Sequence, residues 1–193
     1  MLAMKPRRNN SRTWSGFTLI ELMVTLAVAA VLMTIAVPSF LAFQRNSELT
    51  SAANSLVASL GAARSEAMKT GMPAVVVPAD GSAWTSGWIV FLDKDRDKAF
   101  LESKDRVIFQ QAPFSHIAIT ASGTANGGSP FIMFDSSGYP KGSGGSGFGN
   151  LSFSITHEAI SETRRVIIST AGRIRSCRPS TDNTCGASTN PDS

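Results

Sequence analysis

The sequence has few of the residues on which catalytic and metal sites depend. Its 193 residues include two cysteines and two histidines, with neither a Gly-x-Ser-x-Gly elbow nor a His-Glu-x-x-His zinc motif. His116 and His157 stand apart from any evident acid and nucleophile spacing, so we interpret both as structural. These absences argue against an enzyme, a metal site, a cofactor and a small-molecule substrate. Two cysteines also exclude a dense disulfide scaffold.

Basic residues are not in excess along most of the chain. The formal net charge is +4, and Lys5, Arg7, Arg8 and Arg12, with no acid among residues 1–16, carry all of it. From Phe17 onward, 14 basic residues are balanced by 14 acidic residues. A uniformly basic protein is therefore excluded. The 42% hydrophobic content also excludes a disordered or collagen-like chain.

A long apolar segment follows the basic stretch. Of the 21 residues 17–37, 17 are apolar, and a helix of this length spans about 30 Å, the thickness of a hydrocarbon core. The preceding basic residues predict a cytoplasmic N-terminus. A secretory signal fits poorly because no small-residue cleavage site ends the run. A plain signal anchor explains everything except Glu21, whose carboxylate would cost on the order of 2.5 to 3.5 kcal/mol in a spanning helix.

A short basic leader precedes the run Gly-Phe-Thr-Leu-Ile-Glu-Leu at residues 16–22. This run resembles the signal of type IV pilins and type II secretion pseudopilins. The resemblance implies that a prepilin peptidase cleaves after Gly16, removes residues 1–16 and methylates Phe17. It also implies that Glu21 pairs with the N-terminal ammonium of a neighbouring pilin or pseudopilin subunit, which offsets the cost of both charges in lipid.

The same resemblance implies a location. We expect a single pass through the inner membrane over residues 17–37, with a cytoplasmic leader and a periplasmic C-terminal domain. The subunit would then be incorporated into a pilus or pseudopilus.

The helix is expected to continue beyond the apolar run. Pro38 removes a backbone donor, so a kink or a loosened turn is expected there rather than a helix end. Gly71, followed by Pro73, predicts the helix C-terminus, which gives an N-terminal helix over residues 17–70. Its second half carries one apolar stripe at spacings of three and four. The stripe consists of Leu49, Ala53, Leu56, Leu60, Ala63 and Ala67.

After Gly71 the pattern changes to short β-type runs separated by Gly, Pro, Ser and Asp clusters. We expect strands at residues 74–77, 88–92, 106–110, 117–121, 131–134, 151–156 and 165–169. In the sixth run, apolar and hydroxyl residues alternate, which indicates one buried and one solvated face of an antiparallel sheet. The predicted class is α+β: a long N-terminal helix, transmembrane in its first half, packed on an antiparallel β-sheet domain over residues 71–193. The pilin resemblance implies the same architecture.

Two loops have part of the sequence pattern of a ligand site but lack other residues that such a site requires. The glycine-rich residues 141–150 are interpreted as a mobile loop, because no Lys-Ser/Thr pair or following helix completes a phosphate cradle. Residues 93–97 space three carboxylates as calcium loops do. However, Lys98 and Lys104 stand where an EF-hand requires Gly and an acid, and Lys94 and Arg96 largely neutralise the acids. We interpret this segment as a polar hairpin between the second and third strands.

Arginine is concentrated near the C-terminus. Residues 17–162 have a net charge of −3 and residues 163–193 a net charge of +3. In an extended chain Arg173 and Arg175 point to the same side roughly 6.6 Å apart, a spacing suited to neighbouring phosphates, while Ile174 faces inward. The five cations of this segment are Arg164, Arg165, Arg173, Arg175 and Arg178.

The run Gly-Arg-Ile-Arg at residues 172–175 resembles the Gly-Arg-x-Arg motif of the FimT/GspH group of minor pilins. FimT-type members are linked to DNA capture in natural transformation, so the resemblance implies a type IV pilus subunit that binds DNA. Two alternatives remain open. The arginines could be solvated charges that discourage pairing of an edge strand. The other alternative is an H-type pseudopilin with a purely structural role in type II secretion, although the arginine-rich tail favours the pilus.

Cys177 and Cys185 are eight positions apart, close to this motif. An exported domain meets an oxidising periplasm, where the two thiols would form a disulfide. Closing so small a loop stabilises the fold by about 2.5 kcal/mol in the chain-entropy model. We expect the bond to hold the tail beside Arg173 and Arg175.

Overall fold

The computed structural model describes residues 16–142 and 151–186. Contacts divide the chain into two compact units, Met1–Leu41 and Ala42–Ser193, which are described separately. Almost the whole leader, most of the glycine-rich stretch 141–150 and the last seven residues lie outside the described residues. The predictions made for the leader and for that loop therefore remain predictions.

Helix α1 spans Leu19–Thr70 and continues through Pro38. It ends where the sequence predicted, because Gly71 adopts a left-handed φ of 68° and its N–H donates to the Ala67 carbonyl at 3.0 Å. Every large apolar side chain of residues 17–37 is more than half exposed within the first unit. By length and composition, α1 is long and apolar enough to cross a membrane.

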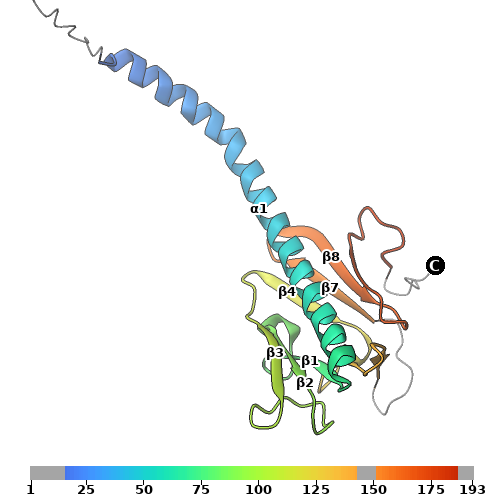
Figure 1. The fold of residues 1–193 in the computed structure, drawn as a ribbon. Coiled ribbons are helices and arrows are strands. Elements are labelled where there is room, and N and C mark those ends of the chain that lie inside the picture. The colour runs from blue at the N-terminus through green and yellow to red at the C-terminus, as the bar shows by residue number, and fades with distance from the viewer. Residues whose placement is uncertain (1–15, 143–150, 187–193) are drawn as a thin grey trace, which may run out of the picture. The chain divides into compact units, whose positions relative to one another are not determined.

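The second unit contains two antiparallel sheets (Figure 1). The five-stranded sheet has the order β3-β2-β1-β5-β6, and the four-stranded sheet has the order β4-β7-β8-β9. The strands are β1 (Ala74–Pro78), β2 (Trp88–Leu92), β3 (Arg106–Gln111), β4 (Ile117–Ala121), β5 (Ile132–Phe134), β6 (Pro140–Lys141), β7 (Leu151–His157), β8 (Ile160–Ile168) and β9 (Ile174–Cys177).

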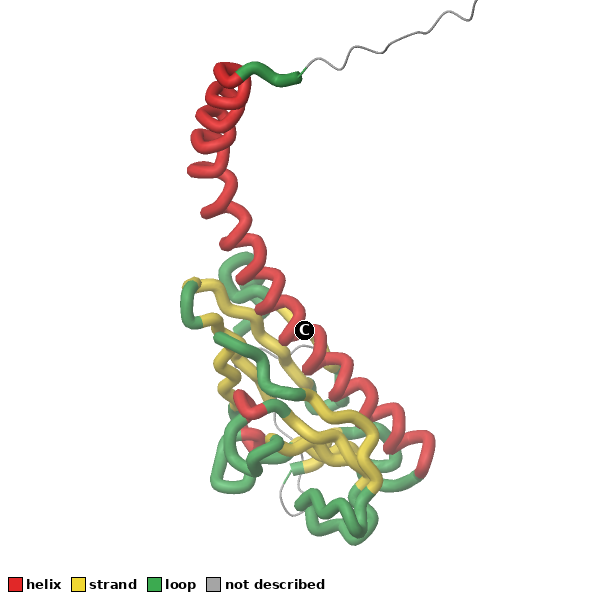
Figure 2. The backbone as a smooth tube through the Cα atoms, turned by 90° about the vertical axis from the view of Figure 1, so that its left-hand side faces the viewer, coloured by secondary structure: helices red, strands yellow, loops and turns green. Residues whose placement is uncertain are grey.

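The second half of α1 packs on these sheets (Figure 2). All six residues of the predicted stripe are at most 2% exposed. They share one core with Val76 and Val90 of the five-stranded sheet and with Phe153, Ile155 and Val166 of the four-stranded sheet. The predicted α+β class, a helix packed on antiparallel sheet, is confirmed.

Some strand boundaries differ from the prediction. β8 begins at Ile160 rather than near Arg165, because the β7–β8 hairpin pairs its polar residues with β7 although they show no apolar alternation. Ser152, expected on a solvated face, is 5% exposed, since its N–H donates to the Ser122 hydroxyl at 2.9 Å. β6 was not expected as a strand. The segment 93–105 does connect β2 to β3 as a polar hairpin loop.

The histidines are less isolated than the sequence indicated. His157 is 6% exposed, and its Nε2 lies 3.2 Å from Glu48 Oε2, so it joins the end of β7 to α1. His116 contacts the Glu158 carboxylate through its ring nitrogen. Glu48 lies 109 positions from His157, and Glu158 lies 42 positions from His116, so the sequence offered little sign of either pair.

Candidate functional site

The β8–β9 hairpin carries the Gly-Arg-Ile-Arg run. The Gly172 N–H donates to the Ser169 carbonyl at 2.9 Å, and the Ser169 N–H donates to the Arg173 carbonyl at 2.9 Å, which closes a tight turn. Gly172 has φ 78°, and a Cβ there would lie 2.8 Å from the Gly138 carbonyl oxygen. Arg64 of α1 donates from Nη1 to the Gly172 carbonyl at 2.8 Å. The first residue of the motif is therefore required by the turn itself.

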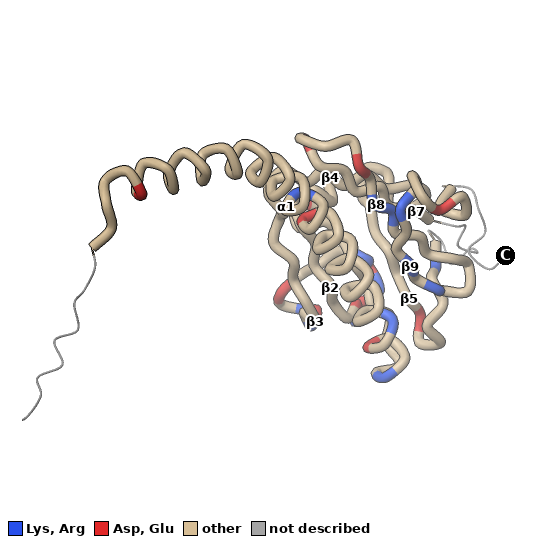
Figure 3. The backbone as a smooth tube through the Cα atoms, turned by 90° about the horizontal axis from the view of Figure 1, so that it is seen from above, with Lys and Arg blue, Asp and Glu red and all other residues tan. Residues whose placement is uncertain are grey.

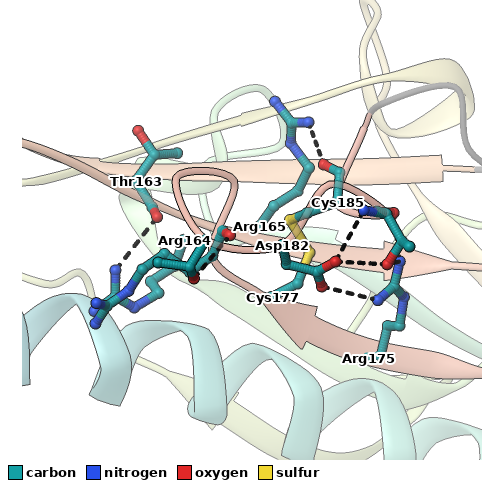
Figure 4. Close-up of a disulfide and its surroundings, with 10 residues drawn as sticks. Thr163, Arg164, Arg165, Arg175, Cys177, Asp182 and Cys185 are labelled. Atoms are coloured by element: carbon teal, nitrogen blue, oxygen red, sulfur yellow. Dashed lines mark hydrogen bonds and ion pairs between the residues drawn. A yellow bond between two sulfur atoms is a disulfide. The ribbon is translucent and has the colours of Figure 1, made fainter.

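Neighbouring side chains of strand β9 face opposite sides of the sheet. Ile174 packs against the core, as predicted, while alternation places Arg175 on the opposite face. Arg175 is directed at the chain that follows the strand (Figure 4): Nη1 lies 3.3 Å from Asp182 Oδ2, and Nη2 donates to the Thr184 carbonyl at 2.6 Å. Its side chain is only 21% exposed.

The tail loop, residues 178–185, folds back and is closed by a disulfide. Cys177 and Cys185 are bonded with a Cα–Cα distance of 5.9 Å, and Cys185 is 1% exposed. Arg165 of β8 donates from Nη1 to the Cys185 carbonyl at 2.6 Å (Figure 4). The predicted disulfide is thus present, and the tail loop lies beside Arg165 and Arg175.

Asp182 organises the tail loop from within. Its Oδ1 accepts hydrogen bonds from the Thr184 hydroxyl at 2.6 Å and the Thr184 N–H at 2.9 Å. These two hydrogen bonds, followed by the charge of Arg175, hold the pKa of Asp182 below its ordinary value. An ionised Asp182 therefore neutralises Arg175 locally.

Another pair of arginines meets at Glu162. Arg164 Nη1 lies 3.6 Å from Glu162 Oε2, and Arg178 Nε lies 3.9 Å from the same oxygen. The Arg164 side chain is 8% exposed, and burial, with the charge of Arg178, lowers its pKa. Arg178 is 44% exposed.

The five predicted cations therefore occupy different environments. In Figure 3 basic positions gather on β8 and β9. Arg164 is buried, and Arg165 and Arg175 are partly buried and bound to the tail loop. Of the five, only Arg173 and Arg178 are exposed to solvent. Arg64 lies 108 positions before Gly172, so the sequence did not indicate it as a partner. Glu162 stands just before Arg164, but nothing in the sequence indicated that it also meets Arg178. The Asp182-x-Thr184 spacing did offer a turn signal for the tail loop.

The predicted assembly residues lie at the start of the first unit. Phe17 is 84% exposed, and α1 begins two residues later. The Thr18 hydroxyl accepts the Glu21 N–H at 3.3 Å, so Thr18 caps the helix and Glu21 stands at its N3 position. Glu21 therefore lies at the positive end of the helix dipole. Gly16 is the first described residue.

Two sequence families match the chain. The profile described as type II transport protein GspH matches residues 52–172, and the prokaryotic N-terminal methylation motif matches residues 15–37. The GspH match thus ends at the turn glycine, before Arg173 and the tail loop. No curated protein matches the chain.

Solved structures share this fold. The type IV minor pilin FimU of Pseudomonas aeruginosa is 21% identical, with a TM-score of 0.52 over 69% of this chain and 90% of that chain. A second crystal form of FimU gives a TM-score of 0.51 over 69% and 95% of the two chains. The minor pseudopilin EpsH from the type 2 secretion system of Vibrio cholerae is 18% identical, with a TM-score of 0.49 over 68% and 98%.

Proposed function

The chain belongs to the family of the type II transport protein GspH, and from this premise we propose that it is assembled as a minor subunit of a type IV pilus. In coarser terms it is a minor pilin or pseudopilin of a type IV pilus or a type II secretion system. The observation that supports a pilin-type subunit is the coincidence of the methylation motif with the start of an apolar helix whose first turn holds Glu21. The arginine-rich C-terminal segment favours the pilus over type II secretion.

The proposed maturation follows from this coincidence. Prepilin peptidase cuts after Gly16 and methylates Phe17, and residues 17–37 hold the subunit in the inner membrane. Glu21 is the one charged residue of that segment and pairs with the N-terminal ammonium of the next subunit. The rest of the chain is periplasmic, a compartment in which the Cys177–Cys185 disulfide persists.

Glu21→Ala tests the assembly step. In the host that encodes the chain, a tagged Glu21→Ala subunit should remain in the membrane fraction and be lost from sheared filaments, as measured by immunoblot. Thr25→Val is the matched control, because Thr25 is exposed in the same segment and bonds only to the Leu22 carbonyl among the described contacts. If Glu21→Ala entered filaments as well as the wild type, the pairing role would be wrong.

The second part of the proposal is DNA contact by the C-terminal hairpin. Support comes from the local net charge of +3 and from the exposure of Arg173 and Arg178 on either side of β9. Arg175 contributes indirectly by ordering the tail loop, since its guanidinium is bound to Asp182 and Thr184. Binding of this kind depends on phosphate contacts, so it is salt-sensitive and shows little sequence preference.

The DNA test uses the exposed pair rather than Arg175, whose loss would also disturb the tail loop. Arg173→Gln with Arg178→Gln in the full-length protein should weaken binding of labelled duplex DNA and reduce the slope of log K against log salt by roughly two. Lys69→Gln with Lys94→Gln removes the same charge from exposed sites elsewhere and should change affinity much less.

An H-type pseudopilin of type II secretion is the alternative, favoured by the family description. It predicts that the two double variants bind DNA equally weakly and that deletion of the chain blocks export of secreted proteins. Loss of pili without a secretion defect supports the pilus assignment.

A further inference from the structure

The loop between β2 and β3, residues 93–105, brings three carboxylates together. Asp93 follows β2 directly, and Asp95 and Asp97 stand two and four positions later. One carboxylate oxygen from each lies within 4.8 Å of those of the other two. Like charges at this distance repel each other, so such a cluster calls for a compensating cation.

Asp93 is the unusual member, because its side chain is fully buried. Its Oδ2 accepts the Lys98 N–H at 3.1 Å, but its Oδ1 is buried without a hydrogen-bond donor among the described residues. A buried acceptor oxygen without a donor is costly, and a cation held by the three carboxylates would compensate that cost.

The basic side chains of the loop leave most of this cluster uncompensated. Lys98 Nζ lies 5.2 Å from the centroid of the Phe131 ring, and Lys94 and Arg96 are exposed. Lys104 is the exception, because its Nζ lies 2.7 Å from Asp95 Oδ2. The nearby carboxylate of Asp105 is already hydrogen-bonded, because its two oxygens accept the N–H groups of Lys94 and Leu101.

We propose that the carboxylates of Asp93, Asp95 and Asp97 bind a calcium ion. The three acids occupy positions 1, 3 and 5 of a calcium loop, and the ligands offered are oxygens only, which hard cations prefer. The sequence argued against this site because Lys98 replaces the glycine at position 6. In the structure Lys98 nonetheless adopts the left-handed φ of 66° that such a loop requires there.

The comparison with an EF-hand loop also predicts how tightly the site binds calcium. Lys104 occupies position 12, where an EF-hand has a bidentate glutamate, so the site has fewer anionic ligands than a cytosolic calcium sensor. A dissociation constant of about 10⁻⁴ to 10⁻³ M is expected, the range of extracellular calcium modules. An exported domain encounters calcium at such concentrations.

Calorimetric titration of calcium chloride into the full-length protein in detergent tests the site. We expect saturable binding, and a thermal midpoint that rises by about 3 to 6 °C at calcium ten times the Kd relative to EDTA. Asp95→Asn with Asp97→Asn should weaken binding at least tenfold. Glu102→Gln, an exposed acid of the same loop outside the cluster, should bind as the wild type does.

A third variant, which is expected to bind calcium more tightly, distinguishes loss of the site from a folding defect. Lys104→Met leaves all three carboxylates and removes the competing ammonium, so calcium should bind about two- to fivefold tighter. The proposal is overturned if the wild type shows neither binding heat nor a thermal shift. It is equally overturned if the double asparagine variant titrates like the wild type, or if Lys104→Met binds no more tightly.

Discussion

Arg165 and Arg175 donate to the Cys185 and Thr184 carbonyls, so two of the five tail arginines bind the protein's own backbone. Arg173 and Arg178 are the exposed ones. A count of basic residues along the sequence treats all of these side chains alike. Which of them can meet an external phosphate depends on how far the fold exposes each side chain.

Gly172→Ala should destabilise the protein by about 1 to 3 kcal/mol. The residue has φ 78°, and its new Cβ would lie 2.8 Å from the Gly138 carbonyl oxygen, a backbone atom that cannot move aside easily. Urea unfolding followed by tryptophan fluorescence measures the change.

Gly127→Ala is the matched control for this substitution. A Cβ at Gly127 meets nothing within 4 Å, and its φ is not left-handed, so stability should stay within about 0.5 kcal/mol of the wild type. Equal behaviour of the two variants would show that the turn tolerates a side chain.

The order of the tail loop should depend on acid pH. Because the pKa of Asp182 is held below 3.8, its hydrogen bonds stabilise the loop above that value and are lost as the pH falls through the lower, folded-state pKa. In an NMR titration, the Thr184 amide should shift with a midpoint below 3.8. Asp182→Asn should abolish that transition, and a midpoint at or above the ordinary value would contradict the assignment.

At the scale of elements, α1 was the most predictable part of the fold. Its stripe, its passage through Pro38 and its end at Gly71 all follow from helical periodicity and glycine conformation. The strands with apolar alternation were also found. The start of β8 was missed, since residues such as Glu162 and Arg164 pair with β7 through backbone bonds that leave no pattern in the side chains.

Leu56→Ala should cost about 2 to 5 kcal/mol, because a fully buried side chain in the shared core of α1 and both sheets is removed. Urea unfolding of the full-length protein in detergent would report this loss through the buried Trp84 and Trp88. Leu32→Ala truncates a leucine that is 61% exposed in the first unit and should leave that transition unchanged. A similar loss in both variants would argue against a core confined to the second half of the helix.

At the scale of the whole molecule, the net charge is a poor guide to function. The leader carries the +4, and the mature chain would have balanced charged side chains. Even the five arginines of the C-terminal segment are partly neutralised, by Asp182 within the tail and by Glu162 just before the segment. The candidate site could therefore be located from sequence, but its exposed surface could not, because the neutralising contacts are formed only on folding.

Reduction of the disulfide should lower the free energy of unfolding by about 2.5 kcal/mol. The bond closes a loop with a sequence separation of eight, and the tail loop also receives Arg165 and Arg175. Unfolding of the full-length protein with and without a reductant measures the change, and Cys177→Ser with Cys185→Ser should match the reduced protein. If the reduced tail were equally ordered by NMR, the disulfide would not be what holds it.

The helix cap at Thr18 bears on how a subunit is activated. If the chain is cut after Gly16 as proposed, the hydroxyl that caps α1 belongs to the second residue of the mature chain, so the removed leader does not contribute to this bond. Cleavage would therefore leave the conformation of that turn intact while creating a new ammonium beside it. The proposed proteolysis would thus supply the positive charge that the proposed pairing with the glutamate of a neighbouring subunit requires.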